Sequence, residues 1–507
     1  MRKLSLFLFV LLYVQQVAAQ IYYQPYSFQQ YHRYGKAVYG EAGTHTAVKP
    51  FVVGKQLDSV YDIVPRDSSR GWLHRKLFQE HLIEVRKDDH RFYADFLPDF
   101  VVGRQTGTNS KTLWTNSRGV QAGLSVKDNF NLYFNFFETQ ARFPTHIDST
   151  ATALGGLPGQ GFSKNLENHE YDWMNTTVHM SYRVSDGFQV ELAYDKLHIG
   201  DGYRSMLLSD NPYNFTYAKF SGQKKRFQYN SVWAYMLDRR NPRVQLLENQ
   251  QSVRLGNASK YAAFQYIDYL ASDKLTVGLF HSLIWSRYSE DNTKKVNGGL
   301  GLNVKYQPWD KYMFYGQMFA DDLSKISFNK DRDRRTAYQL GARAFDVFAV
   351  NNLNITAEFN QAAPYTYQHS NNRINHSNDG EPLAHPNGAN FREILGIATY
   401  RWKRVDLYGQ TMFARYGTDP SATANFGGDI FKSQQPAGGF RIGQGQAIDL
   451  FYNELRVAYV LNPKYNLRWE LGLINRQQKP LSGGDRVNAN IFTIGLRSSF
   501  RTFQTEY

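Results

Sequence analysis

His179 and Ser181 are the two residues whose types and spacing could support catalysis. They lie two positions apart in a stretch of alternating residues, so both side chains share one face if the stretch is a strand. Nucleophilic hydrolysis uses such a histidine beside a serine. The sequence has no GxSxG, HExxH or P-loop pattern, however, and its 13 His lack metal-ligand spacing. We therefore interpret the pair as coincidental, and expect a protein that is not an enzyme and that holds no metal or cofactor.

Two polar segments, 198–211 and 381–393, carry residue types that bind sugars. Sugar sites combine planar polar groups with an aromatic face, and an arginine can hold an acidic sugar through two hydrogen bonds. The competing interpretation is structural: Gly200 and Gly202 serve a tight turn, and a local ion pair between Asp201 and Arg204 pins it. The residues of suitable type are Tyr203, Arg204, Asp210, His385 and Asn387.

The composition narrows the class of protein. The 507 residues include 35 Phe, 35 Tyr and 8 Trp, but no Cys. The lack of cysteine excludes disulfide frameworks, cysteine-ligated zinc, Fe–S clusters, thiol catalysis and the acylated cysteine of a lipoprotein. After the first residues no apolar run reaches the roughly 18 residues of a transmembrane helix. Such a chain fits a secreted all-β protein or a transmembrane β-barrel, whose strands need apolar residues only at alternate positions.

Residues 1–19 have the pattern of a signal peptide. The basic pair 2–3 precedes an apolar stretch over 4–14, and 17–19 supply the small residues of a cleavage site. We predict export with cleavage before Gln20. The formal net charge of +14 favours acidic glycans or phosphorylated lipid headgroups as partners, or reflects a solvated surface; we expect no nucleic-acid partner.

The segment 20–90 is predicted to be a periplasmic or plug element that precedes the barrel. Residues 20–66 are rich in Tyr and Gln and have no clear period. Ser69 is a candidate N-cap for an amphipathic helix over about 71–86. This helix either lies in the periplasm or enters the lumen of the barrel that follows.

The region 91–507 is predicted to be a barrel because its hydrophobic period is two. In 491–500, for example, Phe492 and Ile494 share one face while Thr493 and Arg497 share the other. About eighteen such segments follow one another, joined alternately by short turns and by long loops, among them 104–117, 239–258 and 417–445. An even strand number with this alternation is typical of outer-membrane barrels. The predicted fold class is all-β: a transmembrane antiparallel meander β-barrel of about 18 strands.

The two faces of the strands predict two surroundings. The apolar residues face lipid, and the polar residues face a lumen too wide for side chains alone to fill. The inward residues carry both signs of charge, which fits either an aqueous pore or a network of ion pairs that blocks it. They include Arg183, Glu191, Asp195, Arg343, Glu358, Glu454, Arg456, Arg468, Glu470 and Arg497.

Four segments resemble the Wzi-like capsule-assembly barrels of Bacteroidetes, with closest similarity to their RemB-like gliding-motility branch. The segments are LGGLPGQGF (154–162), HIGDGYRSMLLSDN (198–211), EPLAHPNGANFRE (381–393) and the helix GWLHRKLFQEH (71–81). The resemblance implies an eighteen-stranded barrel closed at its periplasmic end by a helical element. It also implies a ligand site in two loops at the rim, at Asp201, Tyr203, Arg204, Ser209, Asp210, His385, Asn387 and Asn390.

The expected function is therefore that of a non-enzymatic outer-membrane surface protein. It binds or anchors extracellular polysaccharide, for which an acidic composition is one alternative, in capsule assembly, or acts as an adhesin in gliding motility. Its expected partners are outer-membrane lipid, the polysaccharide, and a secretion or gliding machinery. The alternative is an outer-membrane channel for small solutes, because fold alone does not decide between these roles.

Overall fold

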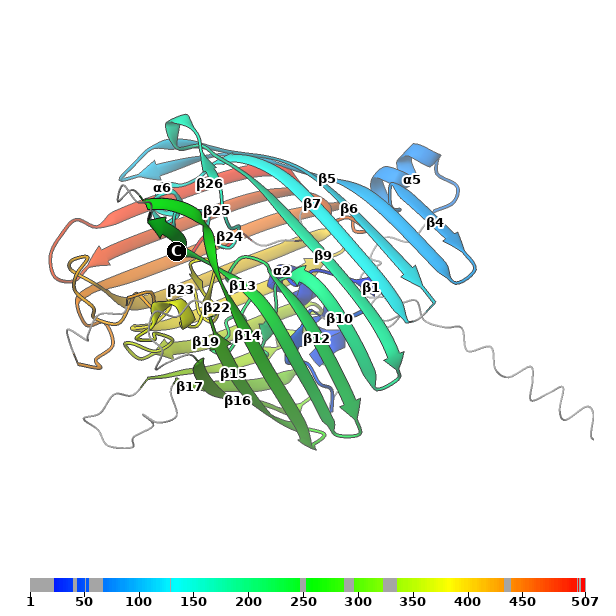
Figure 1. The fold of residues 1–507 in the computed structure, drawn as a ribbon. Coiled ribbons are helices and arrows are strands. Elements are labelled where there is room, and N and C mark those ends of the chain that lie inside the picture. The colour runs from blue at the N-terminus through cyan, green and yellow to red at the C-terminus, as the bar shows by residue number, and fades with distance from the viewer. Residues whose placement is uncertain are drawn as a thin grey trace, which may run out of the picture.

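Figure 1 shows the computed structural model, which describes residues 22–39, 43–50, 52–53, 67–127, 129–246, 252–286, 296–321, 335–432, 439–498, 500 and 503–506. No helix within these ranges has the length and apolar character needed to cross a membrane. The predicted signal peptide, 1–19, and its cleavage site lie outside the described residues.

A closed sheet of eighteen antiparallel strands forms the wall in the described part of the chain. Each strand pairs with its neighbours along the chain, and the last strand closes the barrel onto the first, with Ile494 opposite Val102. The predicted fold class is confirmed. The wall strands are β5 (His90–Gly107), β6 (Lys111–Val126), β7 (Phe130–Arg142), β9 (Tyr171–Ser185), β10 (Phe188–Asp195), β12 (Phe215–Lys224), β13 (Phe227–Leu246), β14 (Ser252–Ser272), β15 (Leu275–Trp285), β16 (Val296–Trp309), β17 (Tyr312–Asp321), β18 (Thr336–Ala344), β19 (Leu353–Ala362), β22 (Phe391–Trp402), β23 (Val405–Thr418), β24 (Gln446–Asn462), β25 (Leu467–Pro480) and β26 (Val487–Arg497).

The two faces of the wall differ as the alternation predicts. On β10, the side chain of Leu192 is 48% exposed, whereas the neighbouring Glu191 is 2% exposed and Asp195 is also buried. Leu192 belongs to an apolar outer band, and a closed barrel with such a band lies in a bilayer because all its backbone polar groups pair within the sheet. The predicted location in the outer membrane is confirmed.

Phe492 offers a direct test of this facing. It lies on β26 and its side chain is 47% exposed on the outer face. We expect Phe492→Arg to reduce the amount of heat-modifiable barrel in the outer membrane, because an arginine at the bilayer midplane costs about 2–4 kcal/mol. Phe492→Leu is the matched control. Equal assembly of the Arg and Leu variants, measured by gel mobility of unheated membranes, contradicts the facing of β26.

β22 carries apolar residues on both faces. Ile394 and Trp402 are exposed on the outer face, whereas Leu395 and Ile397 point into the lumen and pack in an apolar cluster with Phe28. The mixed pattern of this strand therefore reflects an apolar patch in the lumen.

The longer connections gather at one end of the barrel and short turns at the other (Figure 1). On the outer-membrane pattern, the long loops are extracellular. Those that fall within the described residues are 143–170 with α6 (Thr145–Leu154), β8 (Lys164–Asn165) and η2 (Glu167–His169); 196–214 with β11 (His198–Ile199); 363–390 with η5 (Asn372–Ile374), β20 (Ser377–Asn378) and β21 (Glu381–Pro382); and the parts 419–432 and 439–445 of one further loop. The short-turn end includes η4 (Val347–Ala349).

Two predicted long loops are mostly strand. In place of a loop over 104–117, β5 and β6 are joined by 108–110, and in place of a loop over 239–258, β13 continues to Leu246 and β14 begins at Ser252. Strand residues beyond the bilayer are polar on both faces, because no lipid selects for apolar side chains there. Composition therefore does not separate them from loop residues.

The N-terminal segment 22–53 occupies the lumen (Figure 1). It contains β1 (Tyr22–Tyr23), α2 (Phe28–Tyr31), η1 (His32–Tyr34), α3 (Gly35–Tyr39), β2 (Val48–Lys49) and β3 (Val52–Val53). Strand β2 pairs with β11 of the 196–214 loop, and the Arg343 guanidinium lies 5.2 Å from the centre of the Phe28 ring. The irregular region of the sequence thus supplies the plug.

The predicted helix over 71–86 is wrong in length, and of its two predicted places, the periplasm and the lumen, the structure excludes the lumen. Helix α5 covers Trp72–Phe78 only, follows Gly71 without a side-chain cap, and is succeeded by strand β4 (Ile83–Lys87). Strand β4 pairs with residues 90–94 of β5, whereas β26 pairs with residues 99–107 of the same strand. Figure 1 places α5 beside β4 at the end of the wall, and Trp72 is 65% exposed. This helix therefore does not plug the lumen.

The C-terminal residues leave the wall and enter the lumen. Strand β26 ends at Arg497, whereas the alternation predicts an end at Phe500. Phe500 is buried in a cluster with Tyr26, Tyr31 and Tyr34 of the N-terminal segment. Phe503 stacks on Phe143 with ring centres 4.7 Å apart. Period two alone did not reveal this exit, because aromatic residues suit the lumen core and the lipid face equally.

Candidate functional site

The two loop segments predicted to bind ligand meet inside the barrel. The Ser209 N–H donates to the Leu383 carbonyl at 2.7 Å, and the Ser209 hydroxyl donates to the carbonyls of Leu383 and Ala384. Asn211 Nδ2 also donates to the Pro382 carbonyl at 3.0 Å. The 198–211 and 381–393 segments therefore form one packed unit, which sequence spacing did not predict.

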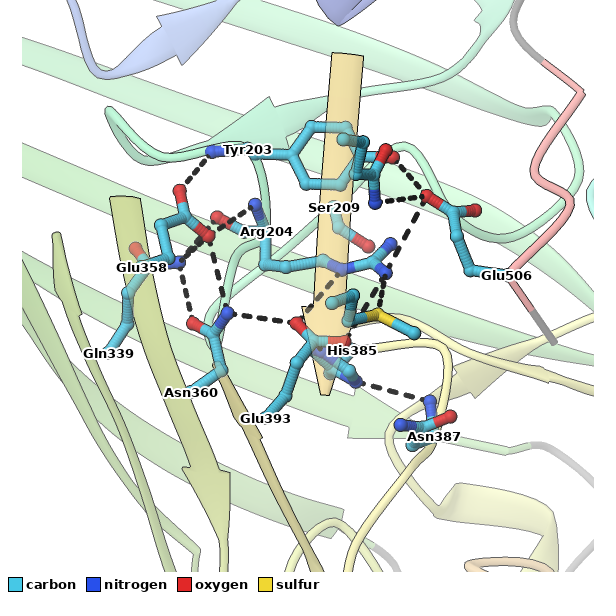
Figure 2. Close-up of polar contacts among 12 residues, drawn as sticks. Tyr203, Arg204, Ser209, Gln339, Glu358, Asn360, His385, Asn387, Glu393 and Glu506 are labelled. Atoms are coloured by element: carbon cyan, nitrogen blue, oxygen red, sulfur yellow. Dashed lines mark hydrogen bonds and ion pairs between the residues drawn. The ribbon is translucent and has the colours of Figure 1, made fainter. Parts of the chain in front are cut away.

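Arg204 lies at the centre of this unit (Figure 2). Its Nε and Nη2 atoms lie 3.3 and 3.4 Å from the two carboxylate oxygens of Glu393, and His385 Nε2 lies 3.1 Å from Glu393 Oε1. All three side chains are buried. Burial lowers the pKa of the His385 imidazole, while the Glu393 carboxylate opposes that shift. Such a buried pair needs both partners, since removing one leaves an unpaired charge without water.

Glu358 fixes the backbone next to Arg204. Its carboxylate accepts from the N–H groups of Tyr203 and Arg204 and, at 2.7 Å, from the Tyr315 hydroxyl. A Cβ on Gly202 would lie 2.7 Å from Glu358 Oε1, so this close approach of backbone to carboxylate requires glycine. Close packing is therefore a reason for glycine at this position that the turn prediction did not include.

The C-terminal residues complete the same network. The Glu506 carboxylate accepts from the Tyr203 hydroxyl and, at 3.2 Å, from Gln410 Nε2 (Figure 2). It also lies 3.8 Å from Arg204 Nη2. Glu506 therefore reaches a buried guanidinium that lies about 300 positions earlier in the chain. No pattern in the sequence indicates this contact.

The other predicted site residues hold neighbouring segments. Asp201 accepts from Thr46 Oγ1 at 2.5 Å and does not pair with Arg204, so the predicted local ion pair is wrong. Asp210 Oδ1 lies 3.3 Å from His198 Nδ1, and His385 Nδ1 accepts from the Asn387 N–H at 3.2 Å. Asn390 Nδ2 donates to the carbonyls of 417, 426 and 444 at 3.0–3.3 Å.

The predicted position of these eight residues at an open rim is wrong. Asp201, Arg204, Ser209, His385 and Asn390 are buried, and the other three are partly buried. Polar loop residues have the same composition whether they face solvent or a folded lumen, so the sequence did not distinguish the two. In this structure they position the extracellular loops.

Glu381 and Arg239, which are not among the predicted site residues, join further loops. Glu381 accepts from the Gly159 N–H at 2.6 Å and from the Tyr213 N–H at 3.2 Å. Burial raises the pKa of its carboxyl to about 7, against the opposing effect of the Gly159 N–H. Arg239 donates to the Asp379 carbonyl at 2.7 Å and to the Gly155 carbonyl at 3.4 Å.

The His179–Ser181 pair lies in a buried network. His179 Nε2 is 2.9 Å from Glu191 Oε2, which Lys219 Nζ also approaches to 2.9 Å. The Tyr23 ring stacks on the imidazole with centres 3.8 Å apart. His179 is fully buried and Ser181 is 4% exposed. The imidazole is therefore covered by the plug and engaged with a carboxylate.

The fold is similar to that of Wzi from Escherichia coli, described as an outer-membrane protein involved in group 1 capsule assembly and a carbohydrate-binding β-barrel. The TM-score is 0.52 with 13% identity, over 80% of this chain and 85% of that chain. Other similar structures are Acinetobacter baumannii OccAB2 (TM-score 0.43, 9% identity, 81% and 98% covered) and Pseudomonas aeruginosa OprD (0.43, 10%, 81% and 96%). No protein-family model and no curated protein sequence matches the chain. At these identities the likeness to Wzi shows a shared fold.

Proposed function

We propose that this chain is a non-enzymatic surface protein of the outer membrane that binds or anchors extracellular polysaccharide. The fold shared with the carbohydrate-binding barrel Wzi supports this role. The two finer forms of the proposal are capsule assembly and adhesion in gliding motility, as in the RemB-like branch. A secretion or gliding machinery would be the protein partner in either case.

The observation that carries the proposal is an apolar core inside the lumen. Residues 206–208, Tyr367 and Leu383 come from two extracellular loops, and each is fully buried. They pack with Val48 of the plug and with inward wall residues such as Phe264 and Phe319. Water-filled porin lumens are polar. An apolar core of this kind favours a barrel that does not conduct and that acts through its extracellular surface.

A solute channel is the alternative function, and conductance separates the two. We expect the purified full-length barrel in a planar lipid bilayer to show no sustained ion conductance. A stable single-channel current at neutral pH would instead support the channel. Binding of polysaccharide extracted from the surface of the producing cells is the positive test, because a non-conducting barrel that binds no polymer lacks the proposed function.

Phe162 is a candidate contact for the polymer. It is 72% exposed on the 143–170 loop, and Glu381 holds this loop through the Gly159 N–H. Lys164, two positions further, is also exposed. An aromatic face beside a cation on a held loop suits an acidic sugar chain.

We expect Phe162→Ala to weaken polysaccharide binding about tenfold, equivalent to about 1.4 kcal/mol, with unchanged barrel assembly. Phe348→Ala is the matched control, since Phe348 is 84% exposed but lies in a turn at the opposite end of the barrel. Retention of the extracted polymer on immobilised protein measures both variants. Equal retention by the two excludes Phe162 as a contact.

A further inference from the structure

The outer face of the wall carries a hollow of about 860 Å³ across β22–β26 and β5. Its floor is formed by small residues, because Gly396, Ala398 and Gly409 occupy outer-face positions where the strands elsewhere carry large side chains. A Cβ on Gly409 would meet no atom within 4 Å, and one on Gly396 would lie 3.6 Å from Thr411. Neither glycine is required by local packing, so their small size creates the hollow.

A row of polar residues crosses this face from strand to strand. Thr411, Asn453, Asn475, Asn490 and Thr106 are direct cross-strand partners in that order. Asn475 Nδ2 donates to Asn490 Oδ1 at 2.7 Å. The row begins near the middle of β23 and ends beside Gly107, the extracellular end of β5. Amide groups facing hydrocarbon are costly without partners. The hollow therefore suits a ligand that is apolar where it lies deep in the bilayer and polar toward the extracellular side.

One basic side chain, Arg104, lines the hollow, and a second, Lys479, lies beyond it toward the extracellular end of β25. Arg104 lines the hollow, is exposed, and lies two positions before Thr106 on the same face of β5. Lys479 is exposed near the end of β25. Its cross-strand partner Asp449 is held by Arg415 in a two-point pair at 2.7 and 2.9 Å. The local balance is positive, which favours an anionic headgroup.

We propose that this hollow binds a phosphorylated glycolipid of the outer leaflet. An acyl chain lies over Gly396 and Gly409, the amides of the polar row bind oxygen atoms of the linker region, and a phosphate contacts Arg104. The hollow lies on the lipid-facing side of the wall, where alkyl chains already surround it. A second copy of this chain cannot fill it through the same patch, because a two-fold contact would place two hollows face to face.

Native mass spectrometry of the full-length barrel in detergent, with added bis-phosphorylated lipid A, tests the proposal. We expect the wild type to retain one lipid A molecule and Gly409→Leu to retain about tenfold less. Gly222→Leu is the matched control: Gly222 is an outer-face glycine on β12 whose added Cβ would also meet nothing within 4 Å. Ala398→Phe fills the same hollow from β22 and replaces Gly409→Leu if that variant does not assemble.

A variant of Arg104, the residue proposed to contact the headgroup, tests the position of the phosphate. We expect Arg104→Gln to weaken retention of lipid A but to leave retention of the uncharged lipid diacylglycerol unchanged. Equal lipid A retention by Gly409→Leu and Gly222→Leu overturns the site. A wild-type barrel that retains no lipid A also overturns the site. The same holds if a bound protein occupies this face instead. Polysaccharide binding measured on the same variants reports separately on the proposed function.

Discussion

We expect a chain that stops at Arg497 to assemble a complete wall and to conduct ions, whereas the full-length chain does not. All eighteen strands end at or before Arg497, so the truncation removes no wall residue. Among the removed residues that the structure describes, three line cavities of the lumen. Phe500 lines two of them, of about 30 and 50 Å³, and Phe503 and Thr505 line the third, of about 180 Å³.

We expect the loss of these residues to join the cavities into a polar passage along the wall. Arg456 and Glu470 line both the second and the third cavity. Single-channel recording in a planar bilayer measures the result, and heat-modifiability of the truncated chain confirms assembly. Phe500→Ala combined with Phe503→Ala provides a second opening that keeps the chain at full length. An assembled, truncated barrel without current contradicts a sealing function of these residues.

Deleting 67–80 is the control for this experiment. That segment contains α5, for which the lumen is one of the two predicted places, but the structure puts it at the end of the wall with Trp72 and Leu73 exposed. We expect no current from this deletion. If the 67–80 deletion conducts and the chain that stops at Arg497 does not, α5 is the element that blocks the lumen.

The second large effect is expected from Arg204→Ala. The substitution leaves Glu393 and Glu506 buried without their shared cation, at a cost of about 3–5 kcal/mol. We expect a large loss of folded barrel in urea titrations followed by gel mobility. Arg204→Lys is expected to fall between the alanine variant and the wild type, because lysine keeps the charge but cannot make the two-point contact.

Arg415→Ala is the matched comparison. Arg415 makes a two-point contact with Asp449 as well, but its side chain is 47% exposed, so we expect a loss below about 1 kcal/mol. If Arg204 instead contacts polysaccharide from an open rim, the Arg204→Ala barrel keeps its stability and loses only polymer binding. The two interpretations therefore predict opposite results from the same protein.

The wall could be predicted from the sequence because lipid imposes a period of two. Phe492 and Ile494 must face hydrocarbon, and Arg497 must face away from it, so the pattern records the environment directly. The segment 22–53 gave no such pattern. Its residues pack against a lumen wall that is charged near Asp195 and Asp406 but apolar near Leu395, and no single period describes both surroundings.

The candidate site was predictable in part for a similar reason. The two loop motifs identify residues that act together, and the structure does join them through Ser209 and Arg204. What the motifs did not reveal is the direction in which the loops fold. His385 and Asn390 suit a hydrated sugar and a buried hydrogen-bond network equally, because both offer the same planar donors and acceptors.

The links between the extracellular loops determine how this surface carries a pulling force. A polymer attached to the 143–170 loop pulls on one loop, but Glu381 ties that loop to 363–390, and Ser209 ties 363–390 to 196–214. The tension therefore spreads over six strand ends rather than two. Bonds that share a load in parallel rupture together at a higher total force than bonds that break one after another. We therefore expect these buried contacts to distribute a pulling force on one extracellular loop over all three loops.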